Sequence, residues 1–323
     1  MECETKIMTF KKRRLATIDL GTNSLLMLIA ERDEQGNLTI LHDELQTPRL
    51  GEGLRETGKI SDAAMERAAS TLKDYAAKAN SMNVEKILAT TTSAMREASN
   101  QKEVLERFQS VSGLDVEVIT PNEEARLTYI SSTSEQGHED PSMVVDIGGG
   151  STEITWGLGP RFDGGRSLKF GTVKLLEGPL QRLEMPTQAT LEQTRTEINQ
   201  YLTRVTALGE LDHYYGTAGS FTHLSSLELQ LSSYSAEAVS GHKITPAMVG
   251  TWLDRLCTLS REQKMALPGI DPRRMDLLIP GCLIIECLFK KFGNQDFTVY
   301  DRGIRYGKLF DALRGFTGQV LAA

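Results

Sequence analysis

The chain has 323 residues, of which 40% are hydrophobic and 24% are charged, and its formal net charge is −7. This length exceeds what one hydrophobic core normally serves and predicts two domains, while the ordinary composition excludes disorder over most of the chain. The negative charge excludes a broad cationic surface, so we expect neither nucleic acid nor a membrane as partner.

The sequence also carries no sign of export or membrane insertion. No uncharged apolar run reaches the roughly 18 residues that a membrane span needs, and residues 1–10 lack the apolar core of a signal peptide. We therefore expect a cytoplasmic protein. The cysteines, which show no paired secretory spacing, are expected to be thiols of the core; they are Cys3, Cys257, Cys282 and Cys287.

The first half alternates strands and helices. Apolar alternation and turn residues predict strands over 15–20, 25–30, 38–42, 87–90 and 115–119. Helices are expected from a cap at Ser61 to about 82, over 102–110, and for about ten residues after the segment 120–126. This order of elements is typical of a ribonuclease-H-like domain.

A polar stretch over 131–141 is expected to link two domains, which we place at 1–135 and 136–323. After a hairpin region over 161–172, the second domain becomes mainly helical. Helices are expected over 191–208, 246–259, 275–292 and 305–313. The last of them could pack back against the first domain.

One short phrase occurs twice, at 18–24 and at 145–151, with the pattern apolar-Asp-apolar-Gly-x-x-Ser. Each copy lies between two apolar runs and therefore predicts a strand, a tight glycine loop and a second strand. The N–H groups of such a loop can surround an anionic oxygen, and the aspartate at the strand end can hold a cation. A single copy is also compatible with an ordinary β-hairpin, but two copies facing each other would form a phosphate clamp.

Further polar residues lie close to these loops in the sequence. Glu153 follows three glycines and could face the same site, or it could simply point outward from its strand. Glu123 and Glu124 begin a helix, where acidic residues also stabilise the helix dipole; at most one of them is expected to face the site. The segment 215–220 could receive a phosphate at a helix N-terminus through Gly219 and Ser220, or could be a tight turn.

Phosphoryl transfer would use all of these groups. Its transition state spreads negative charge, so catalysis depends on positioning, backbone amides, cations and a bound Mg²⁺. Asp19 and Asp146 are suited to hold Mg²⁺ directly or through water. Hydrolysis needs, in addition, a carboxylate that orients and deprotonates water.

The chain resembles the exopolyphosphatase and guanosine pentaphosphate phosphohydrolase family, a branch of the actin, sugar kinase and Hsp70 superfamily. The motifs that carry the resemblance extend over nearly the whole chain and lie at 16–24, 49–54, 92–98, 122–127, 145–153 and 301–305. The resemblance implies an α/β protein of two ribonuclease-H-like domains with an interdomain active-site cleft. It also implies a hydrolase that removes terminal phosphate from inorganic polyphosphate, the 5′ phosphate of pppGpp, or both.

The resemblance further implies roles for single residues. Glu124 would be the base that activates water, and Asp146 and Glu153 would help to hold Mg²⁺ and the attacking water. Arg96 would bind one phosphate. The residues that would cradle the other phosphates are Asn23, Ser24, Gly148, Gly149, Gly150 and Ser151. A homodimer is suggested by the resemblance alone.

The chain departs from the family pattern in two respects. Tyr306 follows Arg305 where family members with the Leu-Arg-Glu-Gly ending carry glutamate. The chain also resembles the short, two-domain form, which lacks the C-terminal helical extension of the longer members. Two other functions stay open: a regulator that binds pppGpp or ppGpp without turnover, or a small-molecule kinase of the same superfamily.

Overall fold

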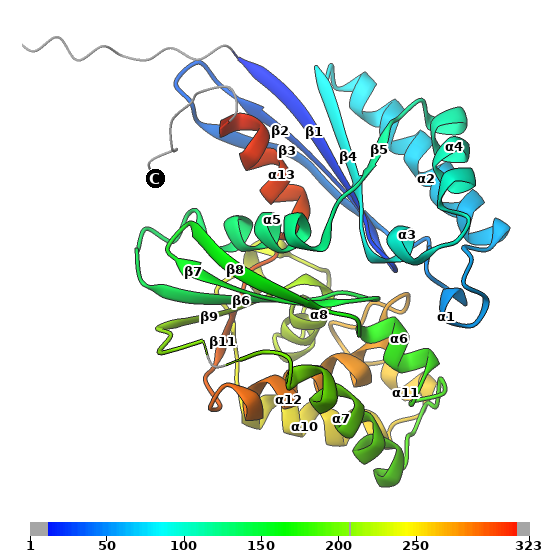
Figure 1. Cartoon of the computed structure of the whole chain (residues 1–323), viewed down its shortest axis with the longest axis vertical. Coiled ribbons are helices and arrows are strands. Elements are labelled where there is room, and N and C mark those ends of the chain that lie inside the picture. The colour runs from blue at the N-terminus through cyan, green and yellow to red at the C-terminus, as the bar shows by residue number, and fades with distance from the viewer. Residues whose placement is uncertain (1–11, 207, 315–323) are drawn as a thin grey trace, which may run out of the picture.

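The computed structural model describes residues 12–206 and 208–314, and its strands form two separate sheets (Figure 1). The first sheet has the order β3-β2-β1-β4-β5, in which β1 is antiparallel to β2 and parallel to β4. Its strands are β1 (Arg13–Leu20), β2 (Leu25–Arg32), β3 (Leu38–Gln46), β4 (Lys86–Thr91) and β5 (Val116–Val118). This sheet is the centre of what we call the first lobe.

The second sheet repeats this arrangement and adds one short strand. Its order is β10-β11-β9-β6-β7-β8, with β6 antiparallel to β7 and parallel to β9. Its strands are β6 (Pro141–Ile147), β7 (Thr152–Leu158), β8 (Arg161–Leu168), β9 (His213–Thr217), β10 (Lys243–Ile244) and β11 (Phe297–Val299). We call this sheet and its helices the second lobe.

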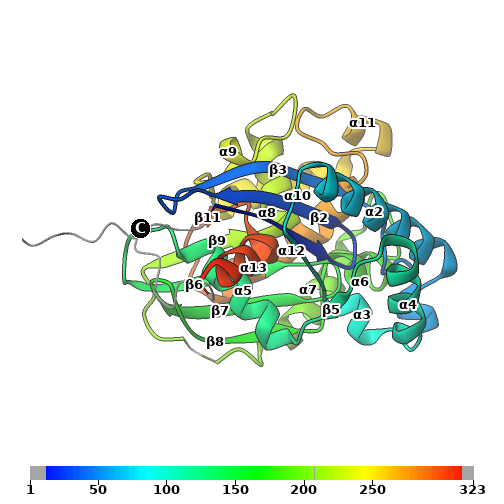
Figure 2. The same ribbon diagram turned by 90° about the horizontal axis from the view of Figure 1, so that it is seen from above.

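Helices cover both sheets (Figure 1). The first lobe carries α1 (Leu54–Thr57), α2 (Asp62–Ser81), α3 (Ser93–Glu97) and α4 (Gln101–Ser112). The second lobe carries α6 (Thr172–Glu177), α7 (Gln188–Leu202), α8 (Ala218–Glu228), α9 (Ala236–Val239), α10 (Pro246–Thr258), α11 (Arg261–Met265), the 3₁₀ helix η1 (Met275–Leu277) and α12 (Leu278–Lys291). Two further helices, α5 (Pro121–Thr133) and α13 (Gly303–Arg314), lie between the sheets (Figure 2).

The alternation of side chains along β1 decides what each face of the first sheet buries, because successive strand residues point to opposite faces. Ile18 and Leu20 belong to the cluster that packs against α2 and α4. Leu15 belongs instead to the cluster with Leu309 and Leu313 of α13. Asp19 shares the parity of Leu15 and therefore lies on the α13 face of the sheet.

The same alternation operates in β6. Val145 and Ile147 join the large core cluster of the second lobe, whereas Val144 packs with Leu127 and Tyr129 of α5. Asp146 shares the parity of Val144 and so lies on the α5 face of the second sheet. Each repeated aspartate is thereby directed away from the main core of its lobe and toward the space between the lobes.

The start of α5 is fixed by its own sequence. Thr120 is the N-cap, its hydroxyl accepts a hydrogen bond from the Glu123 N–H at 3.2 Å, and Pro121 occupies the first helical turn. The two glutamates that follow lie in that first turn, and α5 is buried between α13 and the second sheet. The local signal therefore determines where Glu123 and Glu124 are placed.

The fold class predicted from the sequence is confirmed: the chain is an α/β protein of two ribonuclease-H-like domains. Some element bounds differ from the predictions. Residues 131–133 belong to α5 rather than to the link, α7 ends at Leu202, and the polar segment after β4 forms the short helix α3. Among the described cysteines Cys282 and Cys287 are buried and Cys257 is partly exposed, and Cys3 lies outside the described residues. No helix within 12–206 and 208–314 has the length and apolarity to cross a membrane.

Candidate active site

A cavity of about 740 Å³ lies between the two lobes. It opens where β1, β4, β6 and β9 end, which is where open α/β sheets usually bind ligands. The predicted site residues that line it are Asp19, Asn23, Ser24, Glu124, Asp146, Gly148, Gly149, Gly150, Ser151, Gly219 and Ser220. The fold therefore gathers most of the predicted residues around one space.

The two copies of the repeated phrase have the same local structure. The Gly21 N–H donates to the Ser24 carbonyl at 2.9 Å, and the Gly148 N–H donates to the Ser151 carbonyl at 3.0 Å. The copies differ at one position in the following strand. Asp19 is paired across its sheet with Leu26, but Asp146 is paired with Glu153. The second copy thus carries an additional acid where the first is apolar.

The second glycine loop is in close contact with the first lobe. A Cβ atom on Gly150 would lie 2.7 Å from the Ser93 hydroxyl oxygen and 2.8 Å from that of Thr22. On Gly149 it would lie 3.1 Å from Thr22 Cβ. The glycines at these positions therefore allow the second loop to approach the first lobe closely.

Helices begin immediately after the parallel strands β4 and β9 at the same end of the cavity. Thr217 is the N-cap of α8, so Gly219 and Ser220 lie in the first turn of that helix. In the first lobe, Thr92 and Ser93 occupy the corresponding place at the start of α3 and also line the cavity. The segment 215–220 is therefore part of a strand-to-helix junction that has a counterpart in the first lobe.

Four acidic side chains converge beneath these loops: Asp19, Glu124, Asp146 and Glu153. Burial raises the pKa of Asp146 to about 7, with a further contribution from the charge of Glu124. Asp19 touches the cavity but is otherwise enclosed by protein. Its burial raises its pKa to about 8, with smaller contributions from the charges of Glu124 and Asp146. One of its carboxylate oxygens, Oδ1, has no hydrogen-bond partner.

Glu124 is 5% exposed and is the acid closest to a basic group. Its Oε2 lies 2.8 Å from Nη1 of Arg96, while the same nitrogen donates to the Ile119 carbonyl at 2.9 Å. The contact is an ion pair that lacks hydrogen-bond alignment, since Oε2 has no aligned donor. Burial raises the pKa of Glu124, although Arg96 opposes this effect.

The neighbouring glutamate points elsewhere. Both carboxylate oxygens of Glu123 accept hydrogen bonds from Arg126 at 2.9 Å, and Arg126 also binds Asp311 of α13. Glu123 does not line the cavity. Of the two adjacent glutamates, Glu124 alone faces the candidate site.

Two predicted site residues lie behind the cavity wall rather than in it. Glu153 is 1% exposed, accepts a hydrogen bond from the Ser167 hydroxyl at 2.6 Å, and does not line the cavity. Burial and the charges of Glu124 and Asp146 raise its pKa well above the usual value. Arg96 is also absent from the lining, because it is engaged with Glu124 and Ile119.

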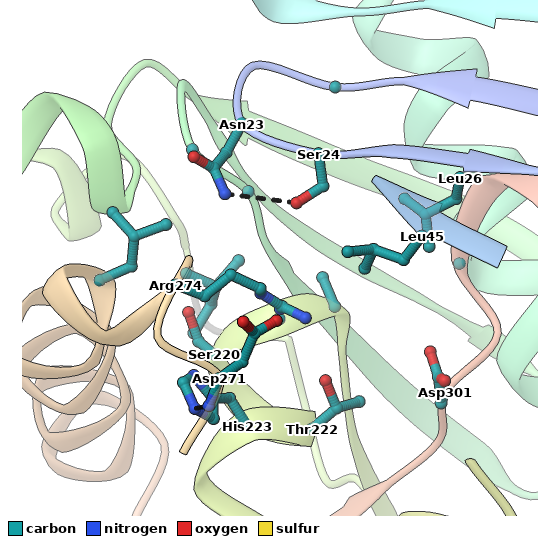
Figure 3. A pocket seen from close by; sticks show the side chains of 18 of the residues that line it. Asn23, Ser24, Leu26, Leu45, Ser220, Thr222, His223, Asp271, Arg274 and Asp301 are labelled. Carbon is teal, nitrogen blue, oxygen red and sulfur yellow. Dashed lines mark hydrogen bonds between the residues drawn. The ribbon is translucent and has the colours of Figure 1, made fainter. Parts of the chain in front are cut away.

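The far side of the cavity contains residues that the sequence did not single out (Figure 3). His223 of α8 accepts a hydrogen bond from the Asp271 N–H at 2.9 Å, which ties the loop 267–274 to α8. Arg274, from the same loop, lies beside Gly219, and Leu26 and Leu45 form an apolar side of the pocket (Figure 3). Pro268, Gly269 and Pro272 mark this segment as a loop in the sequence, but nothing local indicates what it covers.

Arg305 of α13 belongs to the motif 301–305, for which the sequence alone predicted no role. It is buried, binds Asp43 at 3.0 Å and Asp301 at 3.2 Å, and lines the cavity. Tyr306, where the sequence departs from the pattern that the resemblance implies, donates its hydroxyl to Asp43 at 3.2 Å. The tyrosine therefore supports this ion-pair group and does not line the cavity.

Comparison with known proteins identifies the family of this chain. A model of the Ppx/GppA phosphatase family matches residues 28–316. The chain is 31% identical over 310 residues to Exopolyphosphatase 2 of Mycobacterium tuberculosis, an alignment that covers 91% of this chain and 97% of the relative.

Solved structures are similar over almost the whole chain. The Aquifex aeolicus member of the Ppx/GppA family has a TM-score of 0.81 at 29% identity, with 95% of this chain and 99% of that chain covered. An exopolyphosphatase from Cytophaga hutchinsonii has a TM-score of 0.85 at 24% identity, covers 94% of this chain and 98% of its own, and supports the fold alone. The chain therefore belongs to the Ppx/GppA phosphatase family and is a hydrolase that acts on phosphoanhydride bonds.

Proposed function

We propose that this enzyme removes the terminal phosphate of inorganic polyphosphate, the 5′ phosphate of pppGpp, or both, using water that Glu124 activates. The observation that carries the proposal is the position of Glu124. It projects from the first turn of α5 into a cavity whose walls include the two glycine loops, and its neighbour Glu123 is turned away. Polyphosphate and pppGpp present the same terminal phosphoanhydride to such a site.

The environment of Glu124 suits a general base. A base is most effective when its pKa lies near the working pH, and burial raises the pKa of Glu124 toward that range. Arg96 limits the rise and keeps the carboxylate available in its ionised form. In the proposed reaction Glu124 orients water and accepts its proton as the water oxygen attacks the terminal phosphorus and the leaving phosphate keeps the bridging oxygen.

The loops would hold the phosphates. We assign this role to Asn23 and Ser24 in the first lobe, to residues 148–151 in the second, and to Gly219 and Ser220 at the start of α8. Arg96 is proposed to contact the terminal phosphate, which would share its guanidinium with Glu124. Arg273 and Arg274 add positive charge along the rest of the cavity.

A divalent metal fits the acidic group. Ppx/GppA phosphatases generally depend on a divalent metal, and we propose Mg²⁺, held by Asp19 and Asp146 with Glu153 behind them. The unpartnered Asp19 Oδ1 and the mutual rise in pKa of these buried acids both favour a cation here. No three of these acids bring carboxylate oxygens within 4.8 Å of one another, among the residues that the structure describes. This spacing suits Mg²⁺, which usually keeps several waters and takes one or two carboxylates plus phosphate oxygens. The ion would neutralise charge on the transferred phosphate.

The contact between the loops can be tested at Gly150. Replacing it with alanine should lower the rate of phosphate release at least about tenfold, because the new Cβ would displace the Ser93 and Thr22 hydroxyls and move the loop. Gly250, which lies in α10 with no atom within 4 Å of an added Cβ, provides the control. Gly250→Ala should keep full activity, and equal activity of the two variants would refute the packing argument.

In the metal-free protein, the buried acids should make the stability of the folded state depend on pH. The folded pKa values of about 8 for Asp19 and about 7 for Asp146 exceed the value of 3.8 that is usual for aspartate. The folded state therefore binds more protons than the unfolded chain, and the stability that these groups contribute at low pH is lost as the pH rises through those values. Magnesium favours the ionised carboxylates and should raise the melting temperature more at about pH 8 than at about pH 6.

Thermal unfolding with Mg²⁺ or with EDTA measures this difference. Asp19→Asn should make the pH dependence of the EDTA-treated protein less steep, since it removes one of the buried acids whose pKa is raised. The same Mg²⁺-induced shift at both pH values would contradict the assignment of the acids as the metal site.

The substrate is tested by phosphate release from long polyphosphate, short polyphosphate, pppGpp and ATP, measured side by side with Mg²⁺. We expect release from polyphosphate or pppGpp without any acceptor molecule. Binding of pppGpp or ppGpp without release, even at high enzyme concentration, would favour a regulator. Consumption of ATP only when an acceptor is added would favour a kinase. Either result would overturn the proposed function.

A further inference from the structure

A second group of metal-ligating side chains lies on the second lobe, away from the cavity. His138 and Asp140 belong to the connection between α5 and β6, and His213 is the first residue of β9. Asp146 lies at the other end of β6. Because a strand advances about 3.3 Å per residue, the segment from Asp140 to Asp146 separates this group from the candidate active site by about 20 Å.

The three side chains are close enough to share one ion. They are the only described residues whose His, Cys, Asp or Glu ligand atoms form a group of three within 4.8 Å of one another. The distance from His213 Nε2 to Asp140 Oδ2 is 3.3 Å, and from His138 Nδ1 to the same oxygen it is 3.8 Å. Ligand atoms around a tetrahedral zinc ion, with bonds of about 2.0–2.1 Å, lie about 3.3 Å apart. Only a small adjustment would therefore close the site.

The ring of His138 is already oriented for metal binding. Its Nε2 lies 2.8 Å from the hydroxyl of Tyr215, and its Nδ1 accepts a weak hydrogen bond from the Asp140 N–H at 3.3 Å. These partners place the proton on Nε2 and leave the lone pair of Nδ1 toward Asp140. A metal would replace the weak N–H contact. Metal-bound histidines commonly donate their second N–H to a fixed partner, and Tyr215, which is 5% exposed, is such a partner.

The second histidine is held beside the first. The rings of His138 and His213 stack with their centroids 4.0 Å apart and an interplanar angle of 27°. The Asp140 side chain is 56% exposed, so an ion can enter from solvent and keep water in its remaining position. Two imidazoles and one carboxylate are ligands that suit zinc and neighbouring transition metals better than Mg²⁺.

We propose that His138, Asp140 and His213 bind one divalent transition metal of the zinc class, with water completing a tetrahedral site. The ion ties the connection between the lobes to the first residue of β9. It is separate from the Mg²⁺ of the proposed phosphatase reaction, differs from it in ligand chemistry, and has a structural role. The proposal does not depend on which phosphoanhydride the enzyme hydrolyses.

Titration of the chelator-treated full chain with Zn²⁺ and Co²⁺ tests the site. Excess Mg²⁺ is kept present throughout to occupy the oxygen-ligand site. We expect one Zn²⁺ per chain by calorimetry, a rise in melting temperature with Zn²⁺, and the visible absorption of tetrahedral Co²⁺. No binding, or a Co²⁺ spectrum of octahedral type, would overturn the proposal.

Matched variants assign the ligands. His138→Asn with His213→Asn should abolish the tetrahedral Co²⁺ spectrum, and Tyr215→Phe should weaken Zn²⁺ binding by about 10–100-fold because the orienting partner is lost. His42 is the control, since it pairs with Glu44 at 2.9 Å outside this group. His42→Gln should leave the Co²⁺ spectrum unchanged. If the double histidine variant does not fold, Asp140→Asn removes a ligand at an exposed position and should also abolish the tetrahedral Co²⁺ spectrum. Unchanged binding in the ligand variants would overturn the proposal.

Discussion

Replacing Glu124 with glutamine should lower the rate of phosphate release by about a thousandfold, because general-base catalysis contributes about 10²–10⁴-fold. The amide keeps the shape of the side chain but loses its negative charge and its ability to accept a proton. The fold should be preserved. The charge of Glu124 raises the pKa of both Asp19 and Asp146, so its removal relieves repulsion among the buried acids. Removal of the charge also breaks the ion pair with Arg96, which opposes this gain, so the melting temperature of the metal-free variant should stay close to that of the wild type.

The adjacent residue gives a matched control for this prediction. Glu123 lies in the same turn of α5, but its carboxylate binds Arg126 and does not line the cavity. Glu123→Gln should keep activity within about twofold, since it removes only a partly exposed ion pair with Arg126. Steady-state phosphate release and thermal unfolding measure both variants. Near-normal activity of Glu124→Gln would exclude this residue as the base.

Replacing Arg305 with methionine should lower the free energy of unfolding by about 3–5 kcal/mol, because removal of one member of a buried ion-pair group leaves its partners uncompensated. Arg305 lies between Asp43 and Asp301, and its side chain is 6% exposed. Its backbone carbonyl also accepts a hydrogen bond from Thr17 of β1. Methionine preserves much of the side-chain volume, so the loss of unfolding free energy would result from the missing charge rather than from a cavity.

Lys308, on the same helix, provides the comparison. It binds Glu117 at 2.7 Å, and that carboxylate is 61% exposed. Lys308→Met should cost less than about 1 kcal/mol, as expected for an ion pair open to solvent. Urea unfolding of the two variants would separate these effects. An equal loss of unfolding free energy in both variants would show that the burial of the Arg305 ion pairs does not determine how much they stabilise the fold.

The sequence predicted those parts of the site that are built from short local patterns. The repeated phrase specifies a strand end and a glycine turn, and the cap at Thr120 with Pro121 fixes the start of α5. Resemblance to the family then supplied the expectation that Glu124 is the base, which the position of its side chain in the cavity favours. The assigned roles of the site residues stay predictions until variants are measured.

What the sequence could not predict depends on contacts between distant segments. Arg274 reaches the cavity only because loop 267–274 is tied to α8 through His223, and no local pattern encodes that contact. Glu153 appeared equivalent to a cavity residue, but its hydrogen bond to Ser167 of β8 holds it behind the wall. Arg96 lies against Glu124, a contact across 28 residues of sequence that only the fold brings about.

The packing of α13 on the first sheet has a consequence for how the chain reaches its native state during synthesis. Leu309 and Leu313 cover Leu15 and Leu28, so one face of the sheet stays unprotected until residues of α13 have left the ribosome. At synthesis rates of about 5–20 residues per second, the second lobe alone delays that moment by on the order of ten seconds or more. The first lobe, although made first, should therefore become resistant to proteolysis last.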